Sequence, residues 1–124
     1  MATIKSFTSL EQSKKLAEIL PIESADMFYN EEPEDETYPK DIVDTEYPMI
    51  LKEGHIRFLE EYGIPCRSLV ALLNVLPKGY SLGRRINGKY YVCMTNVKHN
   101  ISEFDNSIDA CVAMIERLHE FKIL

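Results

Sequence analysis

The sequence predicts a single α+β domain over residues 1–124, in which a small antiparallel sheet with a C-terminal β-hairpin is packed by about three helices. Three observations predict this class. The chain has 124 residues, the length of one ordinary domain. Apolar residues recur at helical spacing near residues 9–20, 68–76 and 106–120. An Asn-Gly pair between two apolar runs predicts a hairpin over residues 82–94.

The first helix, near residues 9–20, has two overlapping start signals. Thr8 with Glu11 forms one capping box, and Ser9 with Gln12 forms another in the next register. Pro21 is expected to end the helix, because proline cannot donate the backbone hydrogen bond that the next turn needs.

An acidic segment, about residues 30–48, follows a short strand that we expect at 25–29. Residues 31–46 hold eight acids against one lysine. Such a segment has too little apolar surface to offset the entropy lost on ordering, so we interpret it as a solvated loop. Apolar character resumes as a strand at 49–51, and residues 56–62 fit either a strand or a short helix.

Two further helices are predicted from their caps and apolar stripes. Ser68 is a suitable N-cap for a nearly all-apolar helix that Pro77 ends, and this helix should be central and buried. Asp105 or Ser107 caps the last helix. Its core positions are expected to be Ile108, Cys111, Val112, Ile115 and Leu118.

The hairpin carries the candidate binding residues. A two-residue turn would place Arg85 opposite Tyr90 and Arg84 opposite Tyr91. Together with Lys89, these side chains combine positive charge with stacking surfaces, as in proteins that bind single-stranded nucleic acid. The simpler interpretation is cation–π pairing of each arginine with its cross-strand tyrosine on a solvated edge strand. The net charge of −6 favours the simpler interpretation, because nucleic-acid-binding domains are usually basic.

The charge of the chain is divided unevenly. Residues 1–62 carry 15 acids and 6 bases, a net −9, whereas residues 63–124 carry 5 acids and 8 bases, a net +3. No Asp or Glu lies between Tyr62 and Ser102. This division predicts either two faces of one domain that attract each other or a basic surface offered to an acidic partner. In the first case, residues 31–46 would lie across the hairpin.

Catalytic motifs are weak. Residues 79–83 match the G-x-S-x-G pattern of hydrolases, but they lead into a hairpin and not into a helix. Cys66 beside Arg67 at a helix start could be a reactive thiol with His55 or His99 as its base, although a small buried residue is the simpler interpretation. No Cys or His pair has the short spacing of a zinc site. We therefore expect no enzyme activity, metal or cofactor.

Composition and targeting signals indicate a cytoplasmic protein. No apolar run approaches the ~18 residues of a membrane span, and the start of the chain has no apolar signal core. Three cysteines, an odd number, do not form a disulfide framework and are expected to be reduced.

Three stretches, residues 12–21, 65–73 and 109–119, resemble a family of small uncharacterised proteins common in gut Bacteroidetes and their phages and mobile elements. The resemblance covers most of the chain and implies an accessory protein associated with phages or mobile elements. It implies no activity. This family usually has Trp where the present chain has Arg67.

These observations together predict a non-enzymatic accessory or protein-interaction module with a protein partner. The alternative is nucleic-acid binding through the hairpin 82–94, using Arg84, Arg85, Lys89, Tyr90 and Tyr91.

Overall fold

The computed structural model describes residues 5–30, 48–50, 63–94 and 102–124. Most of the predicted acidic segment and the ambiguous residues 56–62 lie outside the described residues. The expected contact between residues 31–46 and the hairpin therefore lies outside them too.

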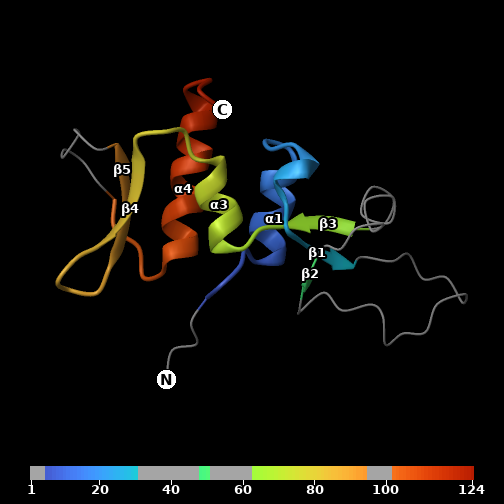
Figure 1. The fold of residues 1–124 in the computed structure, drawn as a ribbon, viewed down its shortest axis with the longest axis horizontal. Helices are drawn as coiled ribbons and strands as arrows, with labels where there is room; N and C mark the ends of the chain where they lie inside the picture. The colour runs from blue at the N-terminus through green and yellow to red at the C-terminus, as the bar shows by residue number, and fades with distance from the viewer. Residues whose placement is uncertain (1–4, 31–47, 51–62, 95–101) are drawn as a thin grey trace, which may run out of the picture.

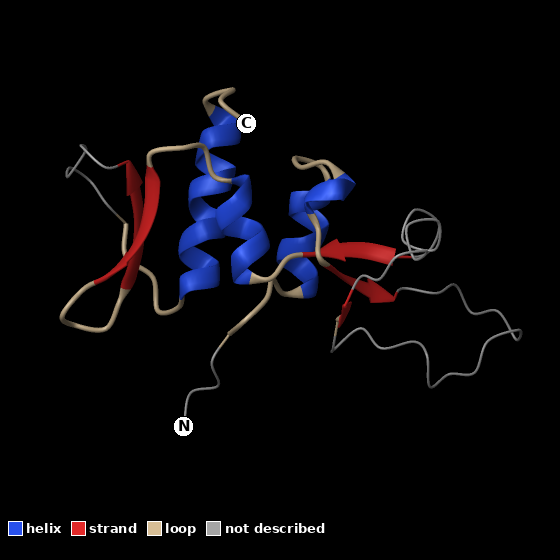
Figure 2. Cartoon of the chain, viewed as in Figure 1, coloured by secondary structure: helices blue, strands red, loops and turns tan. Residues whose placement is uncertain are grey.

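The described chain forms three layers (Figure 1). Helices α1 (Leu10–Ala17), α3 (Leu69–Val75) and α4 (Ser107–Glu120) make the middle layer. A two-stranded sheet lies on one side of the helices and a three-stranded sheet on the other (Figure 2). The α+β class, the C-terminal hairpin and the packing by three helices are thus confirmed. The strands divide into two sheets, where we expected one sheet that contained the hairpin.

The three-stranded sheet has the order β2-β1-β3, and all its pairs are antiparallel. Strand β1 (Met27–Asn30) lies between β2 (Met49–Ile50) and β3 (Gly63–Cys66). A 3₁₀ turn, Ile22–Ser24, connects the end of α1 to β1. We did not predict β3 from the sequence; it contains Pro65, which is tolerated because β3 lies at the edge of this sheet, where proline disturbs no central ladder.

The first helix begins in the second of the two predicted registers. The Ser9 hydroxyl accepts a hydrogen bond from the Gln12 amide at 3.1 Å, and the Gln12 side chain accepts one from the Ser9 amide at 3.0 Å. Thr8 is not the cap, because its side chain is fully buried and bonds to Ser13. Helix α1 ends at Ala17, a little before the expected end.

The other two helices also begin close to their predicted caps. Ser68 caps α3 as expected. The cap of α4 is neither Asp105 nor Ser107 but the residue between them: Asn106 accepts a hydrogen bond from the Asp109 amide at 2.8 Å. The five predicted core positions of α4 are confirmed as buried: Ile108, Cys111, Val112, Ile115 and Leu118.

The predicted hairpin register is wrong by one residue. In the hairpin of β4 (Tyr80–Arg84) and β5 (Tyr90–Met94), Arg84 lies opposite Tyr90 and not opposite the next tyrosine. The loop has three residues instead of two: the Gly88 amide donates to the Arg85 carbonyl at 2.9 Å, and Gly88 has a φ of +88°. A type I turn followed by a left-handed glycine makes such a loop.

The shifted register decides which side chains reach the core, because a one-residue slip moves every side chain of a strand to the other face. Leu82 and Val92 now lie opposite each other, and both pack against the helices. Strand β5 has β4 on one side and a single bridge to Phe104 on the other. The main core joins apolar residues of α1, α3, α4 and β5; its buried members include Leu16, Leu72, Val92, Ile108 and Ile115.

Candidate functional site

The hairpin brings all five predicted binding residues together. The Arg84 guanidinium lies 5.3 Å from the centre of the Tyr90 ring, and the Arg85 guanidinium lies 4.8 Å from that of Tyr91. These are the reverse of the expected pairs, as the shifted register requires. Each arginine is thus engaged with a tyrosine of the same hairpin.

Two of the hairpin cations lie near acids of the segment after β5. Arg85 Nε lies 2.5 Å from a carboxylate oxygen of Glu103, and Lys89 Nζ lies 4.0 Å from one of Asp105. Both acids come just after the stretch that lacks Asp and Glu. Within the described residues, only Arg84 of the three hairpin cations has no acidic partner. The hairpin therefore offers less free positive charge than its sequence suggested.

The G-x-S-x-G pattern has a structural explanation. Gly79 has a φ of +96° in the turn before β4, a conformation that favours glycine. A Cβ at Gly83 would lie 2.4 Å from atoms of the Tyr91 ring, so the ring packs directly on the glycine. Ser81, the would-be nucleophile, is exposed in the middle of β4 and is not on a strand-to-helix turn.

Cys66 lies in the interior and lacks the features of a reactive thiol. It is fully buried, and burial raises the pKa of its thiol, although a hydrogen bond from Thr8 acts in the opposite direction. Burial likewise raises the pKa of Cys111 to about 11. Both thiols therefore stay protonated at neutral pH, which is consistent with packing roles.

Arg67 does not face Cys66 as an activating charge. Its side chain is 0% exposed and turns toward the 3₁₀ turn, where it donates to Ser24 Oγ at 2.8 and 3.0 Å and to the Pro21 carbonyl at 3.1 Å. Desolvation lowers the pKa of Arg67, and electrostatic interactions with Cys66 and then with Asp26 partly offset this effect.

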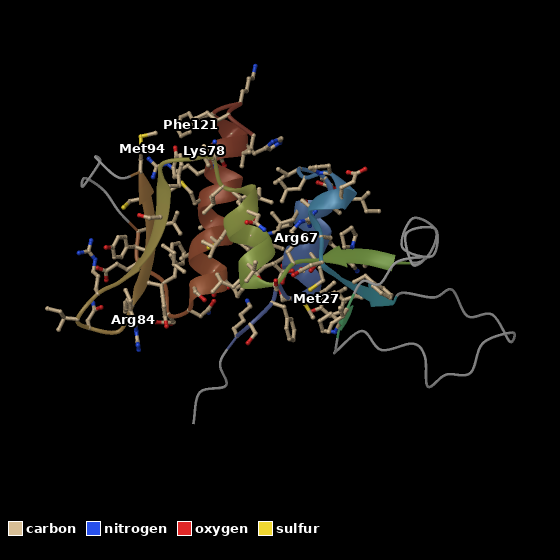
Figure 3. The ribbon with its side chains drawn as sticks, in the orientation of Figure 1. Met27, Arg67, Lys78, Arg84, Met94 and Phe121 are labelled. Carbon is tan, nitrogen blue, oxygen red and sulfur yellow. The ribbon has the colours of Figure 1, made fainter. Side chains whose placement is uncertain are left out.

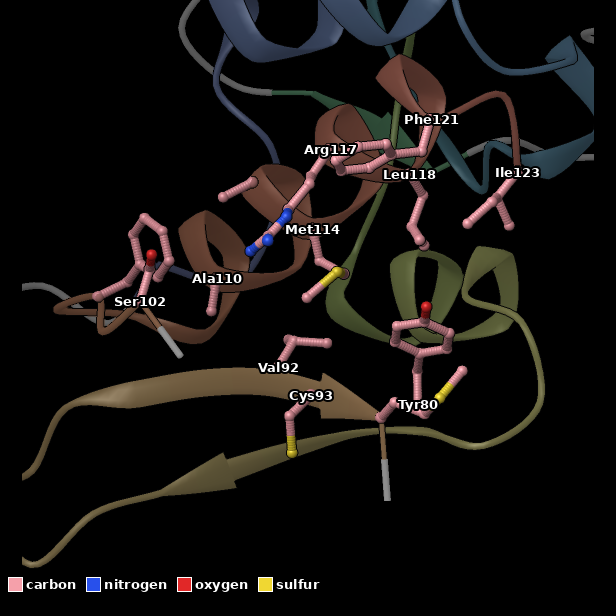
Figure 4. Close-up of a pocket in the computed structure, with 13 residues that line it drawn as sticks. Tyr80, Val92, Cys93, Ser102, Ala110, Met114, Arg117, Leu118, Phe121 and Ile123 are labelled. Atoms are coloured by element: carbon pink, nitrogen blue, oxygen red, sulfur yellow. The ribbon is translucent and has the colours of Figure 1, made fainter. Parts of the chain in front are cut away.

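A groove of about 290 Å³ lies between the hairpin and the second half of α4 (Figure 4). Met114 from α4 and Val92 from β5 point toward each other across it, whereas the Cys93 side chain points to the opposite face of the hairpin. Two small residues of α4, Ala110 and Ala113, are among those that line it. Its lining is mainly apolar and comprises Tyr80, Val92, Cys93, Met94, Ser102, Phe104, Ala110, Ala113, Met114, Arg117, Leu118, Phe121 and Ile123.

Exposed apolar side chains surround the mouth of this groove. Phe121 is 65% exposed, Ile123 56% and Met94 44%. We call these three residues the apolar rim. Met94 and Phe121 lie at the end of the hairpin opposite to Arg84 (Figure 3). The apolar rim and the hairpin cation Arg84 therefore belong to separate surfaces.

Sequence reasoning missed the groove, although a signal was present. Ala110, Ala113, Arg117 and Phe121 repeat at spacings of three or four residues and so form a second stripe on α4, beside the core stripe. The alternation of small residues with one cation and one aromatic residue distinguishes this stripe from a solvated helix face.

A second hollow, of about 590 Å³, lies between the 3₁₀ turn and α3. It is lined by apolar residues such as Leu20 and Val70 and by the acids Glu23 and Asp26. Asp26 already accepts hydrogen bonds from the amide and hydroxyl of Ser68. This carboxylate therefore has a structural partner within the chain.

In the part of the chain that the structure describes, no cluster of His, Cys, Asp and Glu is suited to hold a metal ion. No described helix has the length and apolar character to cross a membrane. The chain was also compared with protein-family models, curated proteins and solved structures, and none of the three comparisons found a match.

Proposed function

We propose that this protein is a non-enzymatic protein-interaction module that binds its partner through the groove between the hairpin and α4. The observation that carries the proposal is the apolar rim around a concave surface. Contiguous exposed apolar surface usually marks an interaction site. The free energy falls when a partner covers such a surface and removes it from water. Burying one large apolar side chain contributes about 1.5–3 kcal/mol.

The position of the rim favours a protein partner over a small molecule. Phe121 and Ile123 line the groove but are each more than half exposed, and a small molecule inside the groove would cover only part of that exposed surface. A polypeptide can place a side chain in the groove and cover the rim with its neighbouring residues. Aromatic and methionine side chains are also enriched at protein interfaces.

Nucleic-acid binding through the hairpin 82–94 stays the alternative proposal, with weaker support. The exposed Arg84 favours it, but Arg85 and Lys89 would have to leave Glu103 and Asp105 to bind phosphate. The resemblance to small Bacteroidetes proteins likewise stays a proposal, and an accessory role in a mobile element is compatible with an interaction module.

Selection of peptides on the full chain tests the leading proposal. A random peptide library displayed on phage should yield binders whose affinity is lost in Ala113→Leu, because leucine fills the groove. Binders should also weaken in Phe121→Ser. The matched control is Val70→Ser, which changes an exposed apolar residue of α3 outside the groove. Absence of binders, or equal binding to Ala113→Leu, would contradict the proposal.

Oligonucleotide binding separates the alternative from the leading proposal. Fluorescence anisotropy with pooled single- and double-stranded oligonucleotides at low salt should show little binding by the wild-type chain. Salt-sensitive binding that disappears in the Arg84→Ala/Arg85→Ala double variant would instead establish the hairpin as a nucleic-acid interface.

A further inference from the structure

We infer that the partner segment presents a carboxylate next to a large apolar side chain, so that Arg117 pairs with the acid while the apolar group fills the groove. This inference rests on the proposed function and adds the chemistry of the partner to it.

The first observation behind this inference is the set of charged residues that line the groove. Among the described residues that line it there is no Asp or Glu, and Arg117 is the only charged one. Within the described residues, Arg117 has no acidic partner. Its guanidinium makes a cation–π contact with the Phe121 ring, whose centre lies 6.0 Å away. By contrast, Lys5 and Arg85 each lie within 3 Å of a carboxylate. Among the described residues, Arg117 is thus a cation beside apolar surface with no acid to pair with.

The second observation is the direction of the Arg117 side chain. Its side chain extends along the groove from Phe121 toward Ala110 and the end where Ser102 lies (Figure 4). The planar guanidinium can bind a carboxylate through two parallel hydrogen bonds. The Phe121 ring lies at one end of this side chain, with its centre 6.0 Å from the guanidinium carbon, and the lining beside the guanidinium is mainly apolar, so an acid bound there has fewer water neighbours than on an open surface. Ion pairs gain strength as water is excluded.

The third observation is the volume of the groove. Sites that enclose a whole small molecule usually have volumes of about 300–1,000 Å³. At about 290 Å³ this groove lies at the lower end of that range, and it has room for a large side chain, such as Leu or Phe, whose backbone stays outside. The backbone and the acidic neighbour of that side chain would then lie over Phe121 and Ile123.

Charge reversal on selected peptides tests the inference. Peptides selected on the wild-type chain should be enriched in Asp or Glu next to Leu, Ile, Phe or Met. Arg117→Glu should weaken the binding of such a peptide by about tenfold or more, since a close ion pair becomes a repulsion. Replacing the acid of the peptide by lysine should restore binding to Arg117→Glu. Arg84→Glu, the same charge change at the hairpin tip, should leave binding unchanged.

The outcomes separate the inference from the proposed function. Peptides that are lost in Ala113→Leu but bind Arg117→Glu as tightly as wild type would overturn the inference and leave the interaction module in place. Binding of decanoate in the groove without selection of any peptide would overturn both, because it would identify a small-molecule site.

Discussion

The two sides of the helical layer differ in how their space is filled. On the sheet side, between α1 and the three-stranded sheet, buried polar side chains bond to one another, and Ile50 of β2 is an exposed apolar residue. On the hairpin side, an apolar groove is left open and its rim faces water. Figure 3 shows the contrast, with Met27 and Arg67 on the first side and Met94 and Phe121 on the second.

The sheet side is organised around Thr8. Its amide donates to the Arg67 carbonyl at 3.0 Å, and its hydroxyl accepts from the Arg67 amide at 3.1 Å. The Tyr29 hydroxyl donates to the Thr8 carbonyl at 2.7 Å, and Ser13 bonds to the Thr8 hydroxyl at 2.8 Å. Buried groups that satisfy one another in this way fix a structure, and Arg67 Nη1 is the one buried side-chain nitrogen or oxygen of the described residues that lacks a partner. We therefore infer that the sheet side mainly stabilises the fold and that the hairpin side binds the partner.

Replacement of Arg67 should give the largest loss of stability. Arg67→Ala removes a buried side chain and leaves Ser24 and the Pro21 carbonyl without their donor, so the free energy of unfolding should fall by about 3 kcal/mol. Arg67→Met keeps most of the volume and avoids the cost of burying a charge, so its loss should be smaller. Urea unfolding followed by circular dichroism measures both. Equal losses for the two variants would show that packing does not dominate.

A pair of substitutions, one on each side, sharpens the comparison. Tyr29→Phe removes one buried hydroxyl and leaves the Thr8 carbonyl short of a donor, which should cost about 1–2 kcal/mol. Phe121→Ser is a far larger chemical change, but it alters an exposed side chain and should cost less than about 0.5 kcal/mol. The same unfolding measurement tests both. A greater loss for Phe121→Ser would make the rim part of the fold and remove the case for an interface.

The junction of α1 and α4 should make stability depend on pH, with a smaller effect. Burial acts to raise the pKa of Asp109, but hydrogen bonds from Lys5 at 2.7 Å, Gln12 at 2.8 Å and Asn106 at 2.8 Å outweigh it, and the pKa is lowered. Since the folded pKa lies below the unfolded one, the carboxylate stabilises the fold above about pH 4, and this contribution is lost as the pH falls further.

Asp109→Asn tests this dependence. The variant should be less stable at pH 7 by about 1 kcal/mol, a modest value because the pair is partly exposed and screened. The difference between wild type and variant should shrink as the pH falls from 5 to 3 in urea titrations. A difference that stays constant over this range would mean that the charge of Asp109 does not contribute.

Local signals predicted the helices well, because caps and apolar stripes act within one element. Ser9 with Gln12, and Ser68, perform the capping that their spacing indicated. The hairpin register could not be read from residues 87 and 88, since Asn-Gly fits both a two-residue turn and the last two positions of a three-residue loop. Strand β3 was missed because its pairing with β1 is non-local.

The groove could be predicted only in part. The stripe formed by Ala110, Ala113, Arg117 and Phe121 is visible in the sequence, but its position beside β5 depends on how the hairpin packs on α4. The charge pattern misled in a similar way. It suggested a free basic hairpin, whereas Glu103 folds back onto Arg85.

Methyl NMR on the full chain tests the central claim most directly. Of the five methionines, Met94 and Met114 line the groove, whereas Met27 belongs to the sheet on the other side. The chain would be labelled with ¹³C at the methionine methyl groups and titrated with a selected peptide. We expect the Met94 and Met114 signals to shift while the Met27 signal stays in place. A bound peptide that moves Met27, or leaves Met94 and Met114 unchanged, would contradict it.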